Sequence, residues 1–164
     1  MGNTLGCIVG ADDGIHATTP QTEQQQASDI LSIILSSESI DEIHKSVNEV
    51  MRTTGWTENI AKALLSGLQD AIDKGAPMAK AATTALKRVR EEAFEFAKDH
   101  PVYATILAIG VLALVMPWVV ESLGFGELGP IEGSFAAWWQ SRYAGYVPKG
   151  SLFSFLQRLG MKWH

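Results

Sequence analysis

The residues of this chain that could catalyse a reaction or bind a metal ion are few and scattered. No two of the four histidines have the spacing of metal ligands; these are His16, His44, His100 and His164. Three carboxylates fall in a glycine-rich loop, where solvent exposure is a simpler role than cation binding: Glu121, Glu127 and Glu132. Ser134 and Ser151 each follow a glycine and fit helix N-caps better than nucleophiles. We therefore predict a protein that is not an enzyme, with no catalytic residue, cofactor or metal site.

The N-terminus carries the one pattern that predicts a covalent modification. The chain opens MGNTLGCIVG, so Gly2 lies at the position of N-myristoylation, and Cys7 lies where a thioester-linked second chain is often added. Gly6 departs from the motif, which asks for Ser or Thr there, and an unmodified tail is the alternative. One acyl chain binds a membrane weakly and two anchor it well. We predict that residues 1–27 form a flexible tail, with Gly2 and Cys7 as lipidation sites.

Residues 102–120, which read VYATILAIGVLALVMPWVV, contain no charged side chain. As one α-helix these nineteen residues would measure roughly 28 Å, close to the thickness of the hydrocarbon core of a bilayer. The sequence predicts a membrane-spanning helix, with a kink at Pro117. The alternative is a helix buried at the centre of a soluble bundle.

Residues 28–99 show the periodicity of amphipathic helices. Ser28 is the predicted start of the first helix, Ser39 and Glu42 form a capping box, and Thr57 is the predicted N-cap of a third helix. A fourth, long helix is expected from Met78 to Asp99. Basic residues precede the apolar segment, and none follows it before Arg142, which predicts a cytosolic N-terminal region.

Two short units, weak copies of each other, follow the apolar segment at an offset of 17 residues. Each begins Gly-Ser and contains a glutamine, and small residues of this kind allow close packing of helices in membranes. The predicted helix-packing motif is Gly133, Ser134, Gln140, Gly150, Ser151 and Gln157. Interfacial exposure is the alternative for the two glutamines. The predicted interfacial anchors are aromatic or snorkelling side chains, namely Trp118, Trp138, Trp139, Arg142 and Trp163. Arg142 could instead pair with Glu121 or Glu132.

The segments GPIEGSFAAWWQS (129–141) and VPKGSLFSFLQRLGM (147–161) resemble the repeated units of the interferon alpha-inducible protein 6/27-like family. The resemblance covers about residues 100–164, and the bulky Trp138 and Trp139 stand where the family has small residues. It implies a small hydrophobic membrane protein of mitochondria or endomembranes, connected with innate immunity and apoptosis. The resemblance implies no catalytic activity.

The charge distribution excludes nucleic acid as a partner. Fifteen of the eighteen acidic residues and nine of the thirteen basic ones lie in residues 1–101, and the net charge of the chain is −5. A phosphate-binding surface needs a clustered excess of Lys and Arg.

The sequence therefore predicts an all-α protein in which a helical region (28–99) precedes a membrane module (100–164). The module is expected to hold one spanning helix and two short amphipathic or re-entrant helices. The predicted function is that of a non-enzymatic integral membrane protein that self-associates and perturbs the lipid bilayer, or recruits partners in stress, defence or cell-death signalling. The alternative is a soluble module whose central hydrophobic helix is buried and whose 28–99 helices bind protein partners.

Overall fold

The computed structural model describes residues 20–52, 55–97, 102–126 and 129–143. Nearly all of these residues form helices, which confirms the predicted mainly helical fold. The helices are α1 (Pro20–Ser36), α2 (Ile40–Val50), α3 (Glu58–Asp73), α4 (Lys80–Ala97), α5 (Tyr103–Val115), α6 (Pro117–Ser122) and α7 (Phe135–Tyr143). A two-stranded antiparallel hairpin of β1 (Phe125–Gly126) and β2 (Gly129–Pro130) separates α6 from α7.

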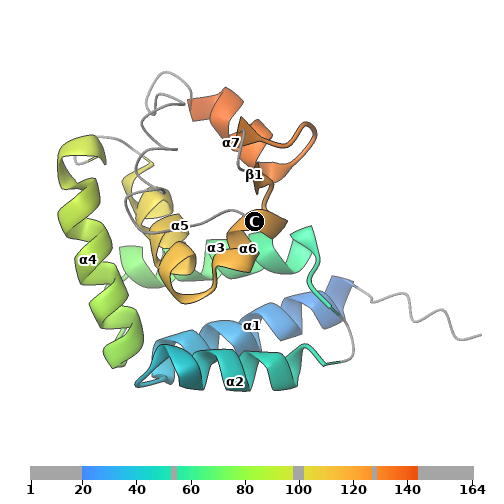
Figure 1. Cartoon of the computed structure of the whole chain (residues 1–164), viewed down its shortest axis with the longest axis vertical. Coiled ribbons are helices and arrows are strands. Elements are labelled where there is room, and N and C mark those ends of the chain that lie inside the picture. Colours follow the sequence, from blue (N-terminus) through green and yellow to red (C-terminus); the bar gives the residue numbers. More distant parts are fainter. Residues whose placement is uncertain (1–19, 53–54, 98–101, 127–128, 144–164) are drawn as a thin grey trace, which may run out of the picture.

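Helix α5 is the centre of the packing. It packs against both α3 and α4, while α1 packs on α2 and α3. Figure 1 shows α1 and α2 side by side at one end of the molecule, α4 along its flank and α7 at the other end. One hydrophobic core joins residues of α1 to α6 with Phe125 and two residues of α7. The predicted boundary near residue 100 therefore does not separate two cores.

Two predicted helix starts are confirmed by their caps. The Ser39 hydroxyl accepts a hydrogen bond from the backbone N–H of Glu42 at 3.2 Å, and the Thr57 hydroxyl accepts one from Ile60 N–H at 3.2 Å. Each cap satisfies an N–H that has no partner within its own helix. The Glu42 carboxylate reaches the N–H of Glu38 at 2.9 Å, one residue before the position that a capping box predicts.

The predicted start of the first helix at Ser28 is wrong, because α1 begins at Pro20. Residues 20–27 lie within this helix and contribute to the fold. Glu23 is buried, and its carboxylate oxygens accept hydrogen bonds from Thr57 Oγ1 at 2.8 Å and from Asn59 Nδ2 at 3.1 Å. These long-range contacts hold the first turns of α1 against the start of α3.

The prediction of one continuous helix over residues 102–120 is also wrong. Helix α5 ends at Val115, Met116 has extended backbone angles (φ −148°, ψ 74°), and Pro117 begins α6. Proline has no N–H to donate to the preceding turn, and its ring disfavours helical geometry at the residue before it. Among the described residues, no helix is both long enough and apolar enough to cross a membrane.

Candidate functional site

Helix α5 combines the most apolar composition of the fold with nearly complete burial. Nine of its thirteen residues are buried, and they lie on every face of the helix. Figure 1 shows α5 next to α4 and crossing α3. A hydrogen bond from Thr105 Oγ1 of α5 to Gln69 Oε1 of α3, 2.9 Å long, links the two helices. A helix that is apolar all round must be enclosed either by protein or by lipid, and here the surrounding helices of the same chain enclose it.

The break between α5 and α6 frees a backbone carbonyl at Val115. In a continuous helix this oxygen would accept from the N–H of Val119, but that N–H donates to the carbonyl of Met116 at 3.0 Å instead. The imidazole of His44, on α2, lies 2.6 Å from the Val115 oxygen through Nε2. Because a carbonyl oxygen only accepts, Nε2 is the donor in this hydrogen bond. His44 thus provides a partner for the end of α5.

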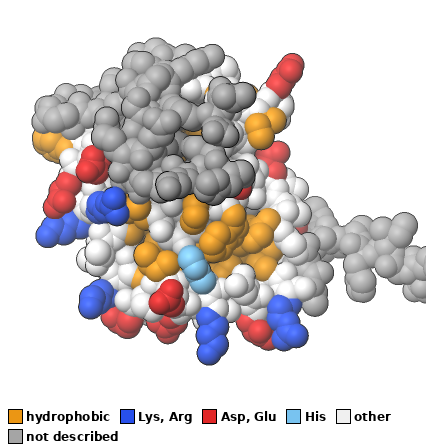
Figure 2. Space-filling model, viewed as in Figure 1, with side chains coloured by type: hydrophobic (Ala, Val, Ile, Leu, Met, Phe, Trp, Pro, Cys, Tyr) orange, Lys and Arg blue, Asp and Glu red, His pale blue; other side chains and the backbone are white. Residues whose placement is uncertain are grey.

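Three aromatic rings surround this junction. The His44 ring stands edge-on to Trp118, with 4.9 Å between ring centroids and 64° between planes, and Trp118 meets Trp56 at 6.4 Å and 63°. The indole N–H of Trp118 is buried and has no hydrogen-bond partner among the residues that the structure describes. Figure 2 shows hydrophobic side chains gathered around a histidine on this face of the molecule. The rings of α2 and α6 and of the segment before α3 therefore meet where the apolar segment is interrupted.

The chain after α6 folds back through a tight turn that fixes α7. Gly124 has φ +90°, and a Cβ there would overlap the side chain of Ser134. The Ser134 hydroxyl accepts from the N–H of Ala137 at 3.3 Å, which confirms its predicted role as a cap. The N–H of Ala136 donates to the carbonyl of Leu123 at 2.9 Å.

Glu58 of α3 attaches the start of α7 to the helical bundle. One of its carboxylate oxygens, Oε1, accepts from the N–H of Phe135 at 2.9 Å and from Lys62 Nζ at 2.9 Å. The hydrogen bond from Lys62 lowers the pKa of Glu58 most; partial burial opposes it, and the bond from Phe135 lowers the pKa further.

The two adjacent tryptophans of α7 have opposite environments. Trp139 is 1% exposed and packs edge-on against Phe125 at 6.2 Å between centroids, whereas Trp138 is 55% exposed. Arg142 lies over the ring of Trp138, with its guanidinium carbon 5.9 Å from the centroid. Trp139 is therefore part of the protein interior, and Trp138 with Arg142 lies on the surface.

The remaining predicted residues differ in burial, and several of them lie outside the described residues. Gln140 is buried, Trp118 is half-buried at the α5–α6 junction, and Gly133 is exposed with open space around its Cα. Their roles in helix packing or membrane anchoring stay predictions. The other predicted residues lie outside the described residues, namely Gly2, Cys7, Gly150, Ser151, Gln157 and Trp163.

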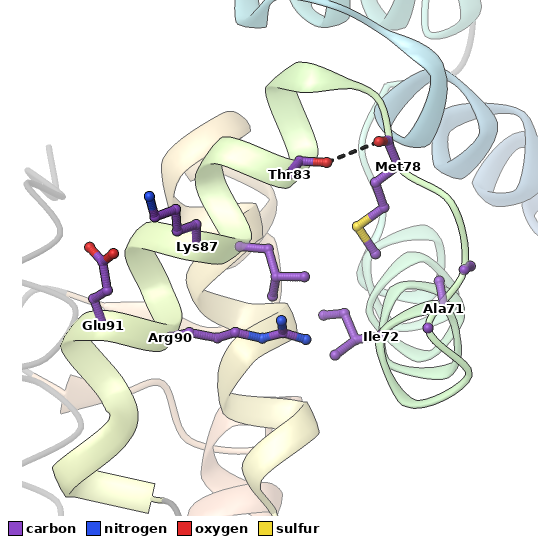
Figure 3. Close-up of a pocket in the computed structure, with 10 residues that line it drawn as sticks. Ala71, Ile72, Met78, Thr83, Lys87, Arg90 and Glu91 are labelled. Atoms are coloured by element: carbon purple, nitrogen blue, oxygen red, sulfur yellow. Dashed lines mark hydrogen bonds between the residues drawn. The ribbon is translucent and has the colours of Figure 1, made fainter.

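A cavity of about 400 Å³ opens between the end of α3 and α4. Figure 3 shows Arg90 extended across it toward Ile72, while Lys87 and Glu91 point away from it. Its lining also includes the apolar side chains of Ala71, Met78 and Leu86. In the part of the chain that the structure covers, no group of three or more His, Cys, Asp or Glu side chains could hold a metal ion.

The described residues define a helical protein whose most apolar helix forms its core. Residues 104–162 match the model of the interferon-induced 6-16 family, which confirms the sequence resemblance for the C-terminal part of the chain. The match begins inside α5 and leaves out α1 to α4. No curated protein and no solved structure matches the chain.

Proposed function

We propose that this chain is a non-enzymatic membrane-active protein that stores its apolar segment inside a helical bundle and releases it into a bilayer. The observation that supports this proposal best is the composition of α5, which carries no charged residue on any face. A bundle helix needs an apolar stripe toward its neighbours only, and this helix is apolar all round. The interferon-induced 6-16 segment begins in this helix, and members of that family are generally membrane-associated.

The energetics of release favour such a role. In water, exposing one large buried aliphatic side chain costs about 1.5–3 kcal/mol, so the six large aliphatic residues among the nine buried residues of α5 hold the bundle closed. In a bilayer this cost vanishes, because lipid tails are as apolar as the side chains of α3 and α4. The equilibrium then depends on what α5 leaves behind, namely the apolar faces of α3 and α4 that packed on it and its polar contacts with Gln69 and His44.

The interruption between α5 and α6 is part of the proposed mechanism. Helices α5 and α6 are each too short to cross a bilayer, but residues 102–120 in one helix would reach roughly 28 Å. Proline is tolerated inside membrane helices, where neighbouring groups satisfy the freed carbonyl. We propose that leaving the bundle allows α5 and α6 to join into one spanning helix kinked at Pro117.

The finer parts of the proposal concern assembly and place. We propose that the released form self-associates through small residues of the Gly-Ser units, and that it perturbs membranes or recruits partners in stress, defence or cell-death signalling. Mitochondrial or endomembrane surfaces, with the N-terminal helices in the cytosol, are the proposed location. Acylation at Gly2 and Cys7 would hold the closed form near such a surface.

A fluorescence experiment tests the release. Cys7 is replaced, and a single cysteine carrying an environment-sensitive dye is placed at Leu114, which is half-buried on α5. A matched label at Lys45, exposed on α2, is the control. Quenchers attached to lipid tails should quench the dye at position 114 after vesicles are added and leave the dye at 45 unchanged. A dye at 114 that lipid quenchers never reach, while the protein remains folded, would contradict the proposal.

A second candidate function is favoured by the burial itself. In this alternative α5 is a permanent core, and the exposed faces of α1 to α4 bind protein partners. The same experiment separates the two functions, because a permanent core keeps position 114 away from lipid at every vesicle concentration. Hydrogen exchange adds a second criterion, since the amides of a permanent core exchange only on global unfolding.

A further inference from the structure

Helix α7 presents an aromatic surface that the packing of the bundle does not use. Trp138 is 55% exposed, and its ring lies 5.8 Å from that of Phe135, at 40°. Arg142 covers part of the Trp138 ring, and Lys62 of α3 lies beside these aromatic groups. Trp138, Phe135 and Lys62 line a hollow of about 420 Å³. We call Trp138, Phe135, Arg142 and Lys62 the α7 face.

Of the two adjacent tryptophans of α7, Trp139 packs against the rest of the protein and Trp138 lies largely in solvent. Trp139 fills the interior beside Phe125, whereas Trp138 remains 55% exposed. An exposed indole beside an arginine is the combination found where a protein meets the boundary between water and lipid. There the ring lies at headgroup depth, and the long basic side chain reaches the phosphates.

The charges around the α7 face decide which lipid surface it fits. The cations Lys62 and Arg142 are offset by Glu58, which pairs with Lys62 at 2.9 Å, and by the exposed Glu132 of the preceding turn. The face is therefore close to neutral, and the whole chain carries a net charge of −5. An anionic membrane would repel such a protein at long range. A zwitterionic headgroup meets no such repulsion.

We infer that the α7 face docks the closed protein onto the headgroup layer of a phosphatidylcholine bilayer before α5 is released. The headgroup phosphate lies at Arg142 and Lys62, which donate charge-assisted hydrogen bonds. The trimethylammonium group lies against the open part of the Trp138 ring, which attracts cations through its π electrons. This inference rests on the proposed membrane function, for which it supplies the first contact.

Vesicle partitioning tests the docking. The full-length protein is mixed with vesicles of phosphatidylcholine alone, and with vesicles that also contain phosphatidylserine, and the bound fraction is measured by flotation. We expect Trp138→Ala to lower the partition coefficient for phosphatidylcholine about tenfold, because a large aromatic surface no longer enters the interface. Phe94→Ala, at a side chain of α4 that is 52% exposed, is the matched control and should bind like the parent.

Three results would overturn the inference. They are equal partitioning of the Trp138→Ala variant and the parent, binding that requires phosphatidylserine, and a lipid-free dimer that Trp138→Ala dissociates. The last result would assign the face to a second copy of the chain. Thermal unfolding of both variants is measured first, and each should unfold like the parent.

The docking and the release of α5 can fail separately. If Trp138-dependent partitioning persists while the dye at position 114 stays away from lipid, the docking stands and the proposed function fails. If that dye enters the bilayer while partitioning ignores Trp138, the proposed function stands and the docking fails.

Discussion

The hydrogen bond between His44 and the end of α5 yields the sharpest prediction for the stability of the closed form. His44→Phe keeps an aromatic ring beside Trp118 but leaves the Val115 carbonyl without its donor. Leaving a partly buried carbonyl unsatisfied costs about 1–3 kcal/mol. His44→Ala also removes the edge-on ring contact at 4.9 Å, worth about 0.5–1.5 kcal/mol more. We therefore expect losses of about 2 kcal/mol for His44→Phe and about 3 kcal/mol for His44→Ala.

Urea unfolding followed by far-ultraviolet circular dichroism measures these losses. Lys45→Ala, at an exposed neighbouring position on α2, is the control and should change the free energy of unfolding by less than about 0.5 kcal/mol. If both His44 variants stay within that limit, the junction does not hold α5 and the reasoning is wrong. If both variants are destabilised, the proposed release of α5 predicts a second effect. A loss of about 2 kcal/mol corresponds to roughly 30-fold in an equilibrium constant, so the dye at position 114 should reach lipid at correspondingly lower vesicle concentrations.

Three further predictions concern the attachment of α7. Trp139→Ala should cost about 3–5 kcal/mol in urea unfolding, because it empties an enclosed site, and a loss under about 1 kcal/mol would show that the indole is not enclosed. Gly124→Ala should lower stability by more than about 2 kcal/mol, since it combines a positive φ with overlap on Ser134, whereas Gly133→Ala, also at positive φ but in open space, should cost about half as much. The folded-state pKa of Glu58 is lowered below its ordinary value of 4.5, so its contribution is present above that pH and is lost as the pH falls through the folded value. Because the side chain is 38% exposed, we expect Glu58→Gln to cost under about 1 kcal/mol at pH 7 and progressively less as the pH falls below 4.5, and a pH-independent difference would contradict this assignment.

Local signals in the sequence were sufficient for the helix caps. Ser39, Thr57 and Ser134 each accept from an N–H three residues ahead, so the residues that define each cap lie in one short window of sequence. The start of α1 could not be read in the same way. Glu23 is buried because Thr57 and Asn59 donate to it from the start of α3, and a glutamine-rich segment gives no sign of a partner so far along the chain.

To predict whether lipid or protein surrounds α5, the apolar segment has to be compared with the helices predicted before it. An uncharged stretch of nineteen residues has the same composition whether lipid or protein encloses it. The sequence did contain a signal for enclosure by protein, because the predicted helices of residues 28–99 each carry an apolar stripe that needs a partner. The position of His44 next to Ile43, on the edge of the α2 stripe, was a weaker signal for the contact with Val115.

The network around Glu23 has a practical consequence for anyone who prepares this protein. A fragment trimmed to begin at Ser28, where the sequence predicted the first helix to start, would lack the Glu23 carboxylate that accepts hydrogen bonds from Thr57 and Asn59. It would also lack the buried methyl group of Ala27. We expect such a fragment to be less stable than the full chain. Any membrane binding that it shows would then result from the truncation and not from the native protein. Fragments should therefore begin ahead of Pro20.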